Sequence, residues 1–352
     1  MLGPRTALSL RSRFPTGAGQ QSFVRRVQVR LQVAVAVASV LVVAVYLAFV
    51  GTATGQRWEN AVLAGRLQDE TLAAAHEADR NLDAVTTSSL GAAVAVLAVM
   101  GLVRRRYALT AVAVSTVGVS LLSAEVLKRY VLCRPDLVGA PGSLLRNSFP
   151  SGHTTIAMSV MFGLLIVVPL RLRGVAVGLC SLWATFVGAY TVAAGWHRPS
   201  DTIGADLLVL AVACGLTAAL ARTGRVRHVR ERRHRLRALL VLAPLSCTAL
   251  LGLGAGTVLL LYSMFRLAPG DPAVPLWAYR AGHALAAGAS AAVTLVLLTL
   301  LRDVDLGRSP APWTPHPCGA SRVEPPGTAG RRLGTSRLIG RLRPAAGRHR
   351  EP

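Results

Sequence analysis

Long apolar stretches alternate with short polar segments over most of this 352-residue chain. Most of the stretches approach the roughly 20 residues that an α-helix needs to cross a bilayer. Backbone polar groups in lipid must be satisfied within the segment, so each stretch is predicted to be a helix. The eight predicted spans are Leu31–Val50, Val85–Val103, Tyr107–Leu127, Thr154–Leu170, Gly174–Ala194, Ile203–Ala221, Ala238–Phe265 and Ala281–Leu301. The pattern therefore predicts an all-α fold, a polytopic membrane helical bundle.

The polar segments divide the chain into five regions. They are a basic N-terminus (1–30), a six-span core (31–221), a basic loop (222–237), two additional spans (238–301) and a basic tail (302–352). The first span is longer than the apolar part of a signal peptide and lacks a small-residue cleavage pattern, so we expect an uncleaved anchor. The tail is rich in Pro, Gly and Arg, a composition typical of disorder.

Basic residues outnumber acidic ones by 39 to 16, which gives a net charge of +23. Such a charge would suit a nucleic-acid partner, but no basic face interleaved with aromatic residues accompanies it. Basic residues also collect in the cytoplasmic loops of membrane proteins. With the N-terminus inside, 29 of the 39 basic residues fall in inner segments. We therefore expect a plasma-membrane protein with both termini cytoplasmic and no nucleic-acid partner.

The acidic residues between the first two predicted spans fit the same orientation. They are Glu59, Asp69, Glu70, Glu77, Asp79 and Asp83, and they fall on the outer side. The five cysteines are odd in number and widely spaced, so the sequence predicts neither a disulfide framework nor a zinc site. No cluster of metal-ligating residues stands out, and we expect no metal and no cofactor.

Polar strings of unusual composition stand at the outer ends of the central spans. Pro150-Ser151-Gly152-His153 comes directly before the fourth span, and His197-Arg198-Pro199-Ser200-Asp201 follows the fifth. Upstream lie Lys128, the single lysine of the chain, and Arg134-Pro135. Two histidines, a carboxylate and several cations on one membrane face are the groups that phosphoryl transfer requires.

These strings resemble the motifs of the type 2 phosphatidic acid phosphatase superfamily, in its integral-membrane branch. That family carries a Lys with an Arg-Pro pair, then Pro-Ser-Gly-His, then Ser-Arg followed by a His and, four residues later, an Asp. The resemblance covers roughly residues 31–221, and the last two predicted spans lie outside it. It implies a membrane phosphatase that needs no metal and has a lipid phosphate as its substrate.

Each motif residue has a role in such chemistry. His197 is the candidate nucleophile, because a neutral imidazole nitrogen can attack phosphorus and form a phosphohistidine. Asp201 can hold the proton of the other ring nitrogen and so fix the tautomer. His153 is the candidate general acid for the leaving oxygen.

The expected phosphate-binding residues are cations and the start of a helix. Lys128 and Arg134 can neutralise the equatorial oxygens, and an arginine can bind two of them at once. Ser151 and Gly152 open the fourth span, where free amides and the helix dipole favour an anion. Arg198 is added to this set because it adjoins the nucleophile.

The match departs from the family pattern in two places. Five residues separate Lys128 from Arg134, where the family usually has six. The Ser-Arg pair of the third motif would fall at Tyr190 and Thr191, so one phosphate-binding arginine is missing. We expect Arg198 or Arg146 to replace it, with Arg198 the first choice.

Other polar residues near these motifs are interpreted as structural. Glu125 can pair with Arg129 at a helix end, and Asp206 lies inside a span, where a carboxylate needs a hydrogen bond. His76 and His283 face outward without a motif partner.

The sequence thus predicts hydrolysis of a lipid phosphomonoester or diphosphate at the outer membrane face. Polyprenyl diphosphates, phosphatidic acid and phosphatidylglycerol phosphate are candidate substrates. Two alternatives remain open: a lipid phosphotransferase that uses the same phosphohistidine, and a catalytically weakened protein that binds lipid phosphates or acts as a scaffold. The oligomeric state is not predicted.

Overall fold

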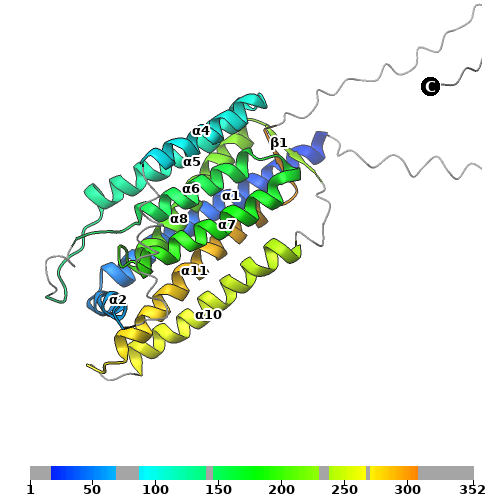
Figure 1. The fold of residues 1–352 in the computed structure, drawn as a ribbon. Helices are drawn as coiled ribbons and strands as arrows, with labels where there is room; N and C mark the ends of the chain where they lie inside the picture. Colours follow the sequence, from blue (N-terminus) through cyan, green and yellow to red (C-terminus); the bar gives the residue numbers. More distant parts are fainter. Residues whose placement is uncertain (1–16, 69–86, 140–145, 230–237, 267–269, 308–352) are drawn as a thin grey trace, which may run out of the picture. The chain divides into compact units, whose positions relative to one another are not determined.

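The structure is a computed structural model, and it describes residues 17–68, 87–139, 146–229, 238–266 and 270–307. These residues are almost entirely helical (Figure 1). The helices are α1 (Gly17–Val45), α2 (Ala53–Gly65), α4 (Thr87–Val103), α5 (Tyr107–Val126), α6 (Gly152–Val167), α7 (Leu170–Ala193), α8 (Pro199–Arg222), α10 (Ala243–Phe265) and α11 (Val274–Leu300). Short π-helical segments extend three of them, at Tyr46–Val50, Leu127–Val131 and Ala238–Leu242.

The all-α prediction is confirmed, and each predicted span coincides with a helix. Five helical segments are long and apolar enough to cross a membrane: Gly19–Val50, Tyr107–Val131, Pro199–Arg222, Leu239–Phe265 and Val274–Leu300. Three shorter apolar helices occupy the other predicted spans, over Ser88–Val103, Gly152–Val167 and Gly178–Ala193. The chain is therefore a helical membrane protein.

Three features differ from the sequence prediction. Helix α1 begins at Gly17 instead of Leu31, because hydropathy marks the part of a helix that lies in lipid and arginines continue the same helix into water. Helix α2 was missed, since it is short and mixed in polarity. Two short strands, β1 (Val226–His228) and β2 (Val304–Leu306), pair antiparallel where two polar segments were expected.

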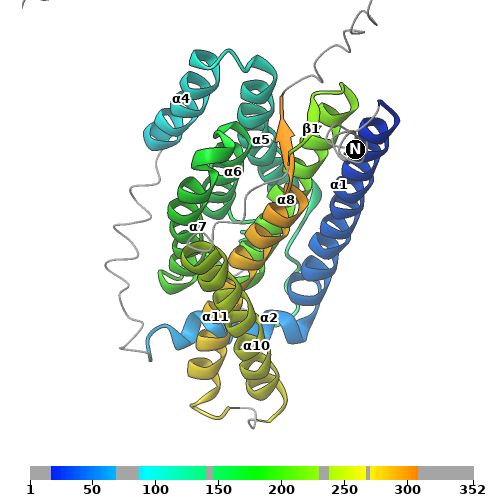
Figure 2. The same cartoon turned by 90° about the vertical axis from the view of Figure 1, so that its right-hand side faces the viewer.

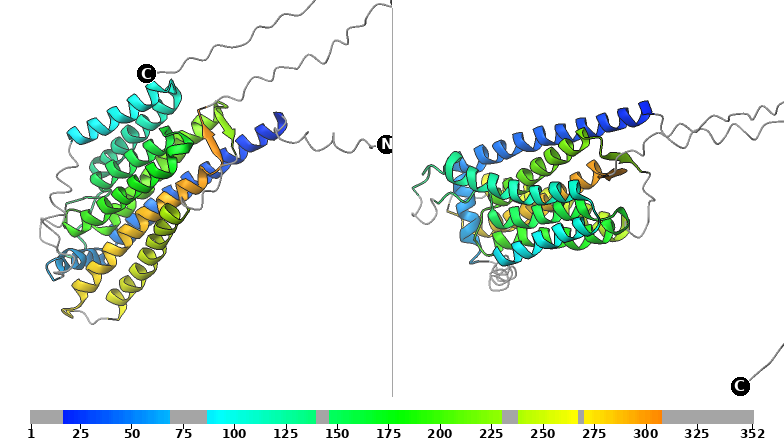
Figure 3. Two further views of the ribbon diagram at one scale, coloured as in Figure 1. Left: turned by 45° about the vertical axis from the view of Figure 1, so that its right-hand side comes forward. Right: turned by 90° about the horizontal axis from the view of Figure 1, so that it is seen from above.

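The most buried helices lie at the centre of the bundle. Helix α6 carries the fully buried Met158, Met161 and Phe162, and α5, α7 and α8 pack around it. Helix α1 packs along α8, while α4 and α10 lie on opposite outer sides (Figure 2). Helix α2 lies across one end of the long helices (Figure 3). The residues of the predicted site stand at this same end.

The last helix belongs to the packed bundle. Helix α11 contacts α2, α7 and α8, and α10 packs mainly against α11. Gly282 of α11 lies where a Cβ would meet the side chains of Pro199 and Val62. Tyr279 is fully buried in a cluster with Trp58 and Val62 of α2. Helix α11 therefore holds α2 in place over the end of the bundle.

The acidic residues from Asp69 to Asp83 and His76 lie outside the described residues, as do residues 1–16 of the basic N-terminus, 230–237 of the basic loop and 308–352 of the tail.

Candidate active site

A cavity of about 390 Å³ opens at the end of the bundle that α2 crosses. It lies between the end of α5, the segment before α6 and the turn from α7 to α8. Its lining is mostly polar and basic: Leu63, Lys128, Arg146, Asn147, Ser148, Gly195, Trp196, His197 and Arg198. The structure thus brings residues of all three motif regions to one place.

His197 occupies the turn between α7 and α8. The carbonyl of Thr191 accepts hydrogen bonds from the backbone N–H groups of Trp196 and His197, each at 3.1 Å. Gly195 has φ of +70°, a conformation that favours glycine. Pro199 then begins α8, where its fixed φ suits the first helical position. The turn leaves the His197 side chain 11% exposed at the cavity wall.

Asp201 is fully buried beside His197 and serves two purposes. Its Oδ2 accepts hydrogen bonds from the backbone N–H of Arg198 at 2.9 Å and from the Ser148 hydroxyl at 2.6 Å. The same oxygen lies 3.3 Å from Nδ1 of His197. Asp201 therefore caps α8 and orients the imidazole at once. With Nδ1–H donating to this carboxylate, the lone pair of Nε2 is left for chemistry.

His153 lies in the first turn of α6 and faces the same turn. Its ring centroid is 6.0 Å from that of His197 and 5.2 Å from that of Trp196. His153 of α6 and His197 of the α7–α8 turn are therefore neighbours, as the predicted roles of acid and nucleophile at one phosphorus require.

Lys128 stands in the π-helical end of α5 and lines the cavity. Its Nζ lies 3.9 Å from the place where a Cβ on Gly152 would stand, so the ammonium lies near the start of α6. The ammonium is also 3.6 Å from Glu125, which pairs more closely with Arg129 at 2.7 Å. The predicted Glu125–Arg129 pair is therefore confirmed.

The side chain of Ser151 forms hydrogen bonds within the first turn of α6. Its Oγ accepts hydrogen bonds from the Thr154 N–H at 3.3 Å and from the Thr154 hydroxyl at 3.1 Å. This makes Ser151 the N-cap of α6, fully buried and outside the cavity lining. Its contact with phosphate stays a prediction.

A buried carboxylate that the motifs do not contain joins the two site arginines. Glu59 of α2 is fully buried, and its Oε2 lies 3.0 Å from Nη1 of Arg134 and 3.9 Å from Nε of Arg198. Its other oxygen accepts a hydrogen bond from the Ser200 hydroxyl. In the sequence, Glu59 is one of several acidic residues of a predicted outer segment, because nothing in the sequence shows that α2 folds back onto the site.

The surroundings of Glu59 have opposing effects on its pKa. Burial, and secondly the charge of Asp201, raise the pKa of Glu59 to about 7, against the opposing effects of the Ser200 hydrogen bond and the two arginines. Arg134 is itself 3% exposed, and its Nη2 is buried without a hydrogen-bond partner among the described residues. Arg134 therefore lies behind the cavity wall, with one donor unused.

Thr191 stands where the family has an arginine, and its side chain is packed inside the bundle. Thr191 is fully buried, donates to the Gly188 carbonyl at 2.8 Å and lies 3.1 Å from the Thr202 hydroxyl. Gly188 next to it packs against Ser290 of α11. No cation enters the cavity from this position.

Of the two suggested replacements, Arg198 is the better placed. Its side chain is 5% exposed, lines the cavity and donates from Nη1 to the Ser148 hydroxyl at 3.1 Å. Arg146 also lines the cavity, but it is exposed. Ser148, which sequence analysis missed, thus links Arg198 to Asp201.

Asp206 of α8 and His283 of α11 are both interpreted as structural residues. Asp206 accepts a hydrogen bond from Ser290 at 2.8 Å, which confirms the predicted structural hydrogen bond. His283 packs near Tyr279, with ring centroids 6.2 Å apart. Among the described residues, no three His, Cys, Asp or Glu side chains gather as a metal-binding group.

Comparison with protein families matches residues 106–227 to the PAP2 superfamily. This segment belongs to the PAP2 superfamily. Comparisons with curated proteins and with solved structures find no match. The PAP2 segment contains every predicted site residue from Lys128 to Asp201, whereas Glu59 and helices α10 and α11 lie outside it. PAP2 members are phosphatases, so the family assignment indicates activity on phosphate esters.

Proposed function

We propose that the protein is a membrane lipid phosphatase that forms a phosphohistidine on His197. The observation that carries this proposal is the His197–Asp201 pair, 3.3 Å apart, at the wall of a cavity lined by Lys128 and Arg198. A neutral imidazole held by a buried carboxylate is a nucleophile whose free nitrogen has a fixed direction.

The reaction has two balanced steps. In the first, Nε2 of His197 attacks phosphorus, the bond from phosphorus to the leaving oxygen breaks, and protonated His153 gives its proton to that oxygen. In the second, His153 takes a proton from water as the water oxygen attacks phosphorus, the bond between phosphorus and Nε2 of His197 breaks, and inorganic phosphate leaves the neutral imidazole. Lys128 and Arg198 neutralise the charge that develops on the equatorial oxygens.

A lipid substrate is supported by where the cavity lies. It opens at the end of apolar helices, so a phosphate headgroup can enter while its chain stays in the bilayer. Polyprenyl diphosphate, phosphatidic acid and phosphatidylglycerol phosphate all meet this description. The distribution of arginines supports cytoplasmic termini and an active site on the outer face of the plasma membrane.

Release of inorganic phosphate from these three lipids by the purified protein in detergent tests the proposal. Wild type should turn over at least one of them, and His197→Ala should lose nearly all turnover. Labelled substrate should leave an acid-labile phosphoprotein in wild type only. Equal turnover by His197→Ala would refute the mechanism.

The two alternatives give different results in the same assay. A phosphotransferase would release little phosphate alone but would label an added lipid acceptor. A binding or scaffold protein, suggested by Thr191, would release none. The position of Arg198 in the cavity wall favours the enzyme, because it supplies a cation that Thr191 does not.

A further inference from the structure

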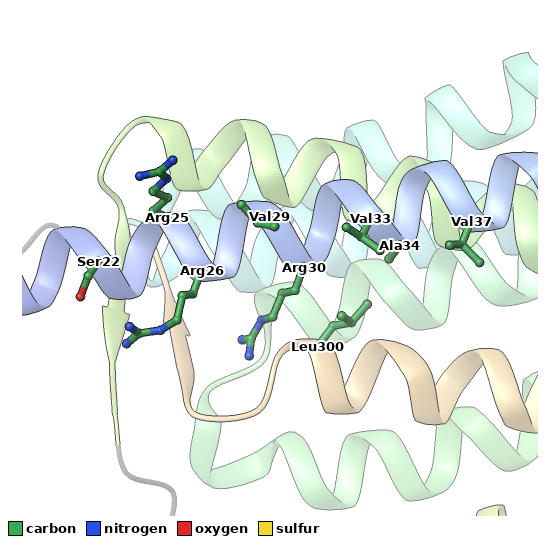
Figure 4. Close-up of a pocket in the computed structure, with 9 residues that line it drawn as sticks. All are labelled: Ser22, Arg25, Arg26, Val29, Arg30, Val33, Ala34, Val37 and Leu300. Atoms are coloured by element: carbon green, nitrogen blue, oxygen red, sulfur yellow. The ribbon is translucent and has the colours of Figure 1, made fainter.

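A groove runs along α1 at the end of the bundle where α11 finishes, away from the candidate active site. It has a volume of about 770 Å³. Apolar side chains form most of its wall, and arginines stand at one end: Ser22, Arg25, Arg26, Val29, Arg30, Val33, Ala34, Val37 and Leu300. Figure 4 shows Arg26 and Arg30 reaching from α1 toward the side on which Leu300 lies. We call this feature the α1–α11 groove.

The length of α1 places the two parts of the groove at different depths. The apolar helical segment Gly19–Val50 has 32 residues. At 1.5 Å per residue it is about 48 Å long, against about 30 Å for the hydrocarbon layer. The residues from Leu31 to Val50 fill that layer by themselves. Arg26 and Arg30 therefore lie at headgroup level, and Val33 and Val37 lie at acyl-chain level.

Charge in the groove is predominantly positive. Arg30 donates to the carbonyl of Arg302 at 3.4 Å, and its Nε is buried without a hydrogen-bond partner among the described residues. Asp303 is the acidic side chain near Arg30, and it is shared with Arg302 at 3.7 Å. Arg25, Arg26 and Arg30 together leave an excess of cations beside an apolar wall.

We propose that the α1–α11 groove binds one anionic phospholipid from the leaflet on the side of the N-terminus. Its phosphate lies against Arg26 and Arg30, and one acyl chain follows Val33, Val37 and Leu300. Basic pockets between helices at the edge of a membrane recognise anionic headgroups in this way. Val33 and Val37 are about half exposed in the chain alone, so lipid must cover them.

This lipid is distinct from the proposed substrate. Gly282 of α11 packs against Pro199 beside the active site, and Leu300 lies 18 residues further along the same helix. That distance is about 27 Å along the helix axis. The groove and the active site therefore lie at opposite ends of the bundle, and binding at one can be measured without turnover at the other.

Native mass spectrometry of the delipidated full chain, titrated with phosphatidylglycerol or phosphatidylcholine in detergent, tests the proposal. Phosphatidylglycerol is a phosphodiester without a terminal phosphate, so the proposed phosphatase reaction does not consume it. Wild type should prefer phosphatidylglycerol. Because each basic residue near the surface contributes about 5-fold, Arg26→Gln with Arg30→Gln should weaken that binding roughly 30-fold. Arg26→Gln alone should give about 5-fold, and it keeps the Arg30–Arg302 contact intact.

Two matched controls separate a site from general charge and general lipid contact. Arg222→Gln removes an exposed arginine at the end of α8 outside the groove and should leave the preference unchanged. Val37→Trp should fill the apolar half and weaken binding of phosphatidylglycerol, whereas Val43→Trp, equally exposed but outside the groove, should not. Equal losses in Arg222→Gln and Arg26→Gln, or no preference in wild type, would overturn the proposal. Competition by glycerol phosphate as strong as by the lipid would show that the groove binds a free anion instead.

Discussion

Arg198 is held at both ends of its guanidinium, by Ser148 at 3.1 Å and by Glu59 at 3.9 Å. It also follows His197 directly in the chain and lines the cavity. These contacts fix a cation beside His197, the proposed nucleophile, in a chain that has Thr191 where the family has an arginine. The position of this positive charge is therefore set by contacts within the protein.

Removal of this cation should cost turnover. Arg198→Ala is expected to lower the rate of phosphate release about 10²-fold, the usual effect of losing one donor to a charged transition state. Arg198→Lys should recover only part of it, because an ammonium cannot bind two oxygens in one plane. Arg146→Ala, an exposed arginine of the same cavity, is the control and should change the rate far less. Full activity in Arg198→Ala would exclude the assigned role.

The raised pKa of Glu59 predicts a pH dependence of stability. A carboxyl whose pKa is about 7 in the folded protein and about 4.5 when unfolded binds its proton more tightly in the folded state. Its favourable contribution is complete below about pH 4.5 and is lost as the pH rises to about 7.

Glu59→Gln removes this titration while keeping the size of the side chain and an acceptor for Ser200. The Tm of wild type in detergent should therefore fall more between pH 5 and pH 8 than the Tm of Glu59→Gln, since all other titrating groups are shared. Two parallel Tm curves would show that Glu59 titrates at its ordinary pKa. A wild-type Tm that rises more steeply than that of the variant would show that the arginines dominate.

At the scale of helices, apolar length predicted the eight long elements, because lipid forces long apolar segments to be helical. Helix α2 and the β1–β2 pairing depend on contacts between distant segments and have no such local signal. The site divides in the same way. His197, His153, Asp201 and Lys128 follow from motif spacing, whereas Glu59 and Ser148 join the site only through folding.

The orientation of the helices is testable by labelling with a membrane-impermeant thiol reagent. Cys133 is exposed at the end of the bundle that carries the active site, and it should react in intact cells. Arg222→Cys in a Cys133→Ser background places a thiol at the opposite end and should react only after the membrane is opened. Cys133→Ser alone gives the background labelling. The reverse pattern of labelling would invert the topology.

Helix α11 lies outside the family segment, yet it packs against helices that carry residues of the candidate site. It packs on α2, which carries Glu59, and on α7 beside Thr191. Gly282 allows the close approach, since a larger residue there would collide with Pro199 and Val62.

Gly282→Val should therefore lower turnover by displacing Glu59 and the start of α8, although position 282 is not in the cavity lining. Gly254→Val on α10 is the matched control, because open space surrounds that glycine. Phosphate release measured at equal amounts of folded protein, judged by size-exclusion chromatography, distinguishes the two variants. Equal rates in both would show that the site does not depend on α11.

The support given by α11 also sets an order of events during synthesis. Residues 106–227, which contain every motif residue, are synthesised before α11. Helix α2, which carries Glu59, therefore lacks its packing partners Tyr279 and Gly282 until α11 follows. Translation that stops early yields a nascent chain with the full family motif and an open arginine pair. We therefore expect the proposed phosphatase activity to develop only after α11 has entered the membrane, so that insertion by the translocon would time maturation of the site.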